Sequence, residues 1–89
     1  MVDKLIINSF IIAAIKEITE KENNFTMDSY FIGPNSTLDS IDIVQIIDFV
    51  EEEIINQGLN SIDLFEIIFD YDCLTFSQFS DLIFKKLNA

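Results

Sequence analysis

The sequence predicts an all-α fold, a four-helix bundle with a long first loop and a short third helix, in a single domain over residues 1–89. Apolar residues recur at spacings of three and four in separate segments, which is the period of an amphipathic helix. Of the 89 residues, 49% are apolar and 24% are charged, which is typical of one small globular domain rather than a disordered segment. Ile and Phe favour strands, but the helical period overrules that propensity.

The first helix is expected to begin after Asp3, which is a suitable N-cap. Its expected core face consists of Ile7, Phe10, Ile11, Ala14, Ile15 and Ile18. A loop follows over residues 21–37, with a turn at residues 33–36, which read Gly-Pro-Asn-Ser. Because about 17 residues is long for a loop in so small a domain, its apolar side chains should lie over the core. These side chains are Phe25, Tyr30, Phe31 and Ile32.

The second helix is expected to start at Leu38-Asp39-Ser40 and to run to about Asn56, with Gly58 ending it. At about 100° per residue, two opposite faces can be distinguished, one apolar and one mostly polar. The apolar face, expected in the core, consists of Ile43, Ile46, Ile47, Val50 and Ile54. The opposite, exposed line consists of Ile41, Gln45, Asp48 and Glu52, flanked by Glu51.

Two capping signatures predict the remaining helices. Asp63 and Glu66 have the spacing of a capping box and open a short third helix that ends near Phe69. Thr75 and Gln78 repeat the signature and open a fourth helix. Its apolar positions are Phe76, Phe79, Ile83 and Leu87, and its last turn carries Lys85 and Lys86, which suit a helix C-terminus.

The charge is strongly acidic, with 16 acidic residues against five lysines, no histidine and a formal net charge of -11. No basic residue stands between Lys21 and Lys85. Nucleic-acid binding is therefore not expected, since such proteins neutralise phosphates with Lys and Arg, and a basic protein partner is expected instead. Without histidine the usual general base is missing, so we expect that the chain is not an enzyme.

Cys73 is the only cysteine, so an intramolecular disulfide or a thiolate zinc site is excluded and no metal is expected. We expect the Cys73 side chain to be buried or half-buried, and the chain to act as a monomer in the reducing cytoplasm. The longest apolar run, residues 10–15, is far shorter than a membrane span of about 20 residues. The N-terminus does not have the pattern of a signal peptide.

The most informative segment is residues 38–44, Leu-Asp-Ser-Ile-Asp-Ile-Val, which Glu51-Glu52-Glu53 follows. An Asp-Ser pair at the start of an acidic second helix, after a long loop in a chain of this size, resembles the acyl carrier protein family. The resemblance implies that Ser40, preceded by Asp39, carries 4'-phosphopantetheine from coenzyme A. The thiol of that group would hold an acyl or aminoacyl group as a thioester.

The same resemblance implies partners for the second helix. They are a phosphopantetheinyl transferase and acyl- or aminoacyl-loading and acyl-processing enzymes with basic surfaces. The residues expected to contact them are Ile41, Gln45, Asp48, Glu51 and Glu52. An apolar Ile41 inside an acidic field would serve as the anchor, and the acids would steer basic enzymes toward it.

Three positions depart from the family pattern. Ile41 stands where the family motif has Leu, and Gln45 stands where an acid is usual, so one charge contact is expected to be weaker. Thr37-Leu38 replaces the Gly-Ala pair of housekeeping fatty-acid carriers. This last departure favours a dedicated biosynthetic pathway and puts fatty-acid or other lipid biosynthesis in doubt without excluding it.

Three alternatives compete with this interpretation. Ser40 could be only the N-cap of the second helix, which is a common role for serine. A calcium loop beginning at Asp70 fails on spacing, because Leu74 and Thr75 stand where a ligand and the required Gly should be. A small acidic helical protein that binds or inhibits a basic partner without modification would explain the charge, but it would leave Asp39-Ser40 unexplained.

Overall fold

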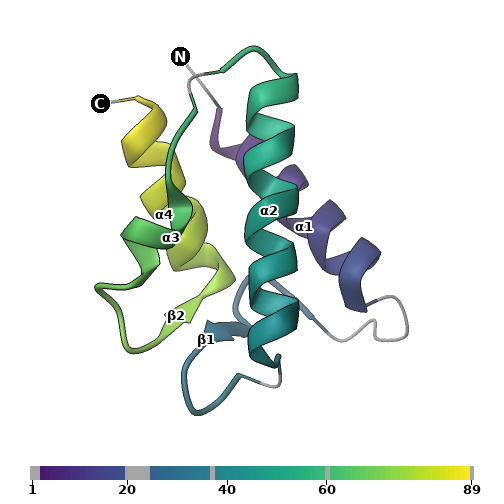
Figure 1. The fold of residues 1–89 in the computed structure, drawn as a ribbon, viewed down its shortest axis with the longest axis vertical. Coiled ribbons are helices and arrows are strands. Elements are labelled where there is room, and N and C mark those ends of the chain that lie inside the picture. Colours follow the sequence, from purple (N-terminus) through teal and green to yellow (C-terminus); the bar gives the residue numbers. More distant parts are fainter. Residues whose placement is uncertain (1–2, 20–24, 37, 60, 89) are drawn as a thin grey trace.

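The computed structural model describes residues 3–19, 25–36, 38–59 and 61–88. Its elements in chain order are α1 (Lys4–Thr19), β1 (Tyr30–Ile32), α2 (Ser40–Asn56), α3 (Leu64–Ile68), β2 (Leu74–Thr75) and α4 (Phe76–Leu87), as Figure 1 shows. The chain is mostly helical, and all four predicted helices are present. α3 is the short one, with 5 residues.

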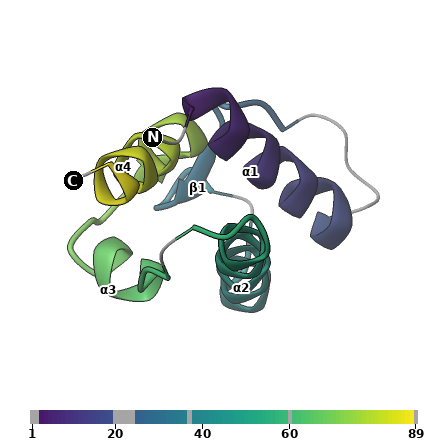
Figure 2. The same cartoon turned by 90° about the horizontal axis from the view of Figure 1, so that it is seen from above.

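The helices lie in two layers, which Figure 2 shows most clearly. α1 and α4 form one layer, and α2 and α3 form the other. α1 packs against both α2 and α4, so it joins the layers. The start of α2 and the strands β1 and β2 lie at the same end of the longest axis (Figure 1).

The strands correct the prediction of an all-α chain. β1 pairs antiparallel with β2, with Tyr30 opposite Thr75 and Ile32 opposite Leu74. The backbone contact continues beyond the strands, because the Phe76 N–H donates to the Ser29 carbonyl at 3.0 Å. Strands of three and two residues are too short to give a recognisable alternation in sequence, so periodicity could not reveal them.

Gly33, directly after β1, is required by the close approach of the two strands. Its φ of 123° is one that side-chain-bearing residues rarely adopt. A Cβ at this position would lie 2.5 Å from the Cβ of Cys73, closer than two such atoms can approach. The glycine therefore allows the chain before α2 to pack against the segment before α4.

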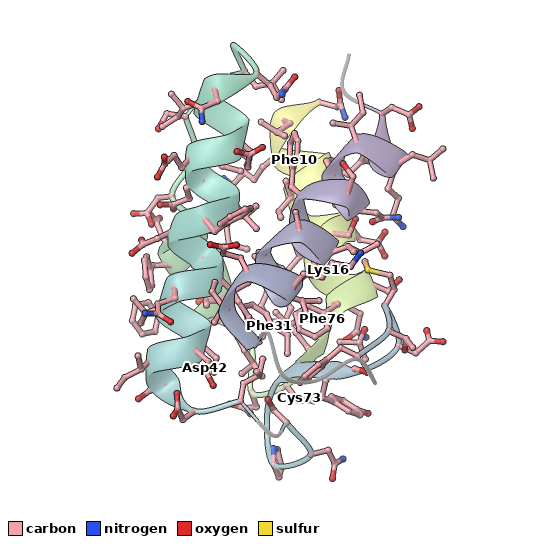
Figure 3. The ribbon with its side chains drawn as sticks, turned by 90° about the vertical axis from the view of Figure 1, so that its right-hand side faces the viewer. Phe10, Lys16, Phe31, Asp42, Cys73 and Phe76 are labelled. Carbon is pink, nitrogen blue, oxygen red and sulfur yellow. The ribbon has the colours of Figure 1, made fainter. Side chains whose placement is uncertain are left out.

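The core lies between the two layers and confirms the predicted apolar faces. The buried members of those faces are Ile7, Phe10, Ile11, Ala14, Ile15, Ile46, Ile47, Val50, Ile54, Phe76, Phe79 and Ile83. Ile18, Ile43 and Leu87 are half-buried at its edge. Phe31 of β1 is fully buried, as expected for the loop, and its ring centroid lies 4.6 Å from that of Phe79 and 5.2 Å from that of Phe76 (Figure 3).

Two side chains expected near the core are exposed instead, Tyr30 and Cys73. Each directly precedes a buried residue in extended backbone, Phe31 and Leu74 respectively. Successive side chains of a strand point to opposite faces, so the inward position of each neighbour turns Tyr30 and Cys73 outward. The expectation that Cys73 is buried or half-buried was wrong.

Polar contacts join α1 to α4. The Ser80 hydroxyl, fully buried in α4, donates to Oδ1 of Asn8 in α1. An ion pair between Lys4 and Asp81 joins the same helices at the surface. A buried hydroxyl without a partner is costly, so Asn8 allows the polar Ser80 to be accommodated in the core.

Candidate functional site

Asp39, and not Ser40, is the N-cap of α2. The Asp39 backbone is extended, with φ -88° and ψ 176°. Its Oδ1 accepts from the Asp42 N–H at 2.8 Å, and its carbonyl accepts from the Ile43 N–H at 3.1 Å. Ser40 is the first helical residue. The alternative in which Ser40 is the N-cap is therefore wrong.

The Ser40 side chain is exposed and makes no hydrogen bond to any residue that the structure describes. Several other serines use their hydroxyls in the fold. Ser9 donates to the Ile6 carbonyl at 2.6 Å, and Ser29 accepts from the Thr26 N–H at 3.0 Å. Ser40 resembles Ser61 in being an exposed serine without such a contact. Its hydroxyl is accessible to another protein.

Ser36 fixes the segment that leads into α2, a role that the sequence analysis did not assign. Its hydroxyl donates to the Phe31 carbonyl at 3.0 Å and accepts from the Leu38 N–H at 3.2 Å. Its own N–H donates to the Gly33 carbonyl at 3.0 Å, which closes the turn. Because Phe31 is anchored in the core, these bonds position the backbone directly before Asp39 and Ser40. The Gly-Pro-Asn-Ser sequence was the one indication, available from the sequence, that Ser36 lies in a turn.

The electrostatic setting of Ser40 favours a negatively charged substituent. The first intrahelical bond at this end is the one from the Ile43 N–H to Asp39, so the N–H groups of Ser40 and Ile41 lie ahead of it without intrahelical partners. The N-terminus of a helix also carries the positive end of the helix dipole. Both features favour negative charge near this end of the helix. Asp42 in the first turn opposes this in part (Figure 3).

The exposed line predicted on α2 is largely present. Ile41 is 66% exposed, and Gln45, Asp48 and Glu52 are exposed along the same helix. Val44 and Ile55 are also exposed, at 41% and 56%, and extend the apolar part of this surface. The sequence analysis missed these two, although at 100° per residue both fall within about 60° of Ile41.

Glu51 differs from the other residues of the expected partner surface. It is half-buried, and its Oε2 accepts from the Leu64 N–H at 2.9 Å. Leu64 is the first residue of α3, so the carboxylate satisfies an N–H that has no partner within that helix. Glu51 therefore ties α3 to α2, and its availability to a partner is reduced.

A separate groove lies between α3 and α4 and has a volume of about 580 Å³. Its apolar lining includes Ile62, Ile67 and Leu82, and charged side chains from both elements surround it. No residue of α2 lines it, so it does not include any residue of the predicted site.

Within residues 3–19, 25–36, 38–59 and 61–88, no group of three or more acidic or cysteine side chains is arranged to hold a metal ion. None of the helices in these ranges is long and apolar enough to cross a membrane. Comparisons with protein-family models, curated proteins and solved structures gave no match for this chain. The function is therefore inferred from the site itself.

Proposed function

We propose that this chain is a carrier protein of the acyl carrier class, with 4'-phosphopantetheine attached to Ser40. One observation carries the proposal. Asp39 caps the helix, which leaves the Ser40 hydroxyl exposed and without a hydrogen bond among the described residues. A serine that makes no such bond, at a capped helix start, suits modification by another enzyme.

The chemistry requires a second protein. In the proposed transfer, the Ser40 Oγ forms a bond to the phosphorus of the pantetheine phosphate, and the pyrophosphate bond of coenzyme A breaks. Adenosine 3',5'-bisphosphate leaves, and a base takes the hydroxyl proton. The chain has no histidine, the commonest general base, and we propose that the transferase supplies this base. Once attached, the group supplies a thiol that holds an acyl or aminoacyl cargo as a thioester.

The α2 surface supports the choice of partners. Asp48 and Glu52 are exposed and make no ion pair within the described residues, so they are free to attract basic enzymes. Ile41, one residue after Ser40, offers an apolar anchor beside the attachment point. We propose that a phosphopantetheinyl transferase and the enzymes that load and process the cargo dock here, in the cytoplasm and in a dedicated pathway.

The fold also supports the proposal. The four helices follow one another with a long connection between α1 and α2 and with a short α3, which is the order expected of a carrier protein. The β1–β2 ribbon is an addition to that plan. It joins the long connection to the segment before α4, and through Ser36 it positions the start of α2.

A second candidate function is an acidic protein that binds a basic partner without being modified. The exposed, unpaired acids of α2 favour it equally. A substitution of Ser40 distinguishes the two functions, because only the carrier needs the Ser40 hydroxyl.

The test is intact mass after incubation with coenzyme A and a broad-specificity phosphopantetheinyl transferase. We expect the wild type and a Ser61→Ala control to gain one phosphopantetheinyl group, and Ser40→Ala to gain none. Ser61 is the matched control because it is also an exposed serine. No gain by the wild type, or an equal gain by Ser40→Ala, would overturn the proposal and leave the unmodified binding protein.

A further inference from the structure

The groove between α3 and α4 is not used by the proposed carrier function. Its volume of about 580 Å³ lies within the range of roughly 300–1,000 Å³ that is typical of sites for small molecules. Ile62 and Ile67 on one wall and Leu82 on the other are half-buried and form its apolar lining. In Figure 2, α3 and α4 lie beside each other in different layers, and the groove separates them.

The two walls of the groove carry opposite charges. Glu66 and Asp70 lie on the wall that includes α3. Lys85 and Lys86 lie on the wall formed by α4. All four side chains are exposed, and none of them makes an ion pair within the described residues. Asp63 also lines the groove, but its carboxylate already accepts from the Glu66 N–H as the N-cap of α3.

The charges also lie toward opposite ends of the groove. Tyr71, which directly follows Asp70, and Leu82 line a second, smaller groove as well, of about 230 Å³, which continues to Leu74 of β2. The two lysines do not line this second groove and lie in the last turn of α4. From Gln78 in the second groove to the last lysine, the helix rises about 12 Å. A ligand bound along α4 would therefore have an acid near one end and two lysines near the other.

This distribution of charge limits the kinds of ligand that fit. An anion such as a nucleotide would be repelled by the two acids and by the net charge of -11. A purely basic peptide would meet lysines here, whereas α2 offers it five acids and no base. A neutral aliphatic chain would fill the apolar lining but would make no use of the charges. A ligand with an apolar body and opposite charges at its two ends complements all of these features.

We propose that this groove binds a short apolar peptide with free amino and carboxyl termini. Its ammonium group lies near Glu66 and Asp70, its carboxylate lies near Lys85 and Lys86, and its side chains pack on the apolar lining. An extended chain rises about 3.3 Å per residue, so three residues cover about 10 Å and fit the length available along α4. In a single amino acid the two charges are too close together to reach both ends. The inference does not depend on modification of Ser40, because no residue of α2 lines the groove.

The test is a titration of the ¹⁵N-labelled full chain with the tripeptide Leu-Gly-Leu, followed by amide chemical shifts. We expect the shifts to change at the residues that line the groove and not along α2. The N-acetylated and the C-amidated forms of the same peptide each lack one terminal charge. Each should bind about two- to fivefold more weakly than the free peptide, which is the effect of losing an exposed ion pair.

Two pairs of substitutions assign the ends of the peptide. Lys85→Gln with Lys86→Gln should weaken binding of the free peptide but not of the C-amidated one, which has no carboxylate to lose. Glu66→Gln with Asp70→Asn should weaken binding of the free peptide but not of the N-acetylated one. A pair that weakens both forms of the peptide equally would overturn the assignment of that end.

A matched control makes the same charge change outside the groove. Asp48→Asn with Glu52→Gln, on exposed α2, should leave binding of the free peptide unchanged. Equal weakening by this pair would overturn the proposal, because net charge and not the groove would then control binding.

Three further results would overturn the proposal. The first is the absence of any shift change in the groove at millimolar free peptide. The second is equal binding of the free peptide and of a form blocked at both ends, which would mean that the charges are not recognised. The third is tighter binding of octanoate than of the peptide, which would assign the groove to an aliphatic chain.

Discussion

The two layers of the molecule use their polar groups differently. Between α1 and α4, Ser80 donates to Asn8 and Lys4 pairs with Asp81, so polar side chains hold the helices to each other. In the α2 and α3 layer, the one such contact among the described residues is the acceptance of the Leu64 N–H by Glu51. The exposed acids of α2 contribute nothing comparable to the fold. Polar side chains therefore help to hold the first layer together, whereas the exposed acids of α2 make no ion pair among the described residues.

The largest expected effect concerns the core that both layers share. Phe31→Ala should lower the free energy of unfolding by about 3–5 kcal/mol, because it removes a fully buried ring stacked on Phe79. Phe69→Ala is the control, since Phe69 is 83% exposed and should change stability by less than about 0.5 kcal/mol. Urea unfolding measures both. Similar losses for the two variants would show that β1 is not part of the core.

Removing the buried hydroxyl tests the first layer directly. Ser80→Ala should lower the free energy of unfolding by about 1–3 kcal/mol, because Oδ1 of Asn8 loses its hydrogen-bond donor inside the protein. Ser77→Ala, one turn nearer the start of α4 and without a side-chain hydrogen bond among the described residues, should cost less. An equal loss of unfolding free energy at both positions would mean that the Ser80–Asn8 hydrogen bond does not help to hold α1 to α4.

Neutralising acids tests the second layer. Asp48→Asn with Glu52→Gln should slow phosphopantetheine transfer about tenfold at low salt, through loss of electrostatic steering, and should hardly change stability. Asp70→Asn with Asp72→Asn makes the same charge change away from α2 and should slow transfer less. The readout is kcat/KM of the transferase at low and high salt. Equal slowing by both pairs would mean that net charge, and not the α2 surface, steers the partner.

The smallest effect is expected at the surface ion pair. Lys4→Ala should lower the free energy of unfolding by no more than about 1 kcal/mol. The side chains of Lys4 and Asp81 are 41% and 55% exposed, so salt screens their attraction. Thermal unfolding with and without added salt checks this. A cost comparable to that of Ser80→Ala would mean that the ion pair, rather than the buried hydrogen bond, holds α1 to α4.

Local patterns predicted the helices well. The period of apolar residues identified the buried faces of α1, α2 and α4, and the capping box at the start of α4 is present, with Thr75 and Gln78 each bonded to the backbone of the other. At Asp63 only one half of the predicted capping box is present among the described residues, the bond from the Glu66 N–H to the Asp63 side chain. These features depend on residues three or four positions apart, which the sequence displays directly.

Contacts between distant residues could not be predicted in this way. The pairing of Ile32 with Leu74 and the bond between Asn8 and Ser80 join segments far apart in the chain, and no local period marks them. The role of Glu51 was missed for the same reason, because its partner Leu64 lies in another helix. At the site, Asp39 and Ser40 are both residue types that cap helices, and only the geometry assigned the cap to Asp39.

The central claim is a division of roles between Asp39 and Ser40, and it is tested most directly by measuring stability and modification on the same two variants. Asp39→Ala should lower the free energy of unfolding by about 1 kcal/mol, as loss of an N-cap does, and should still be modified at Ser40, although more slowly. Ser40→Ala should change stability by less than about 0.5 kcal/mol and gain no phosphopantetheinyl group. A Ser40→Ala variant that is destabilised as much as Asp39→Ala, or that is still modified, would contradict the account.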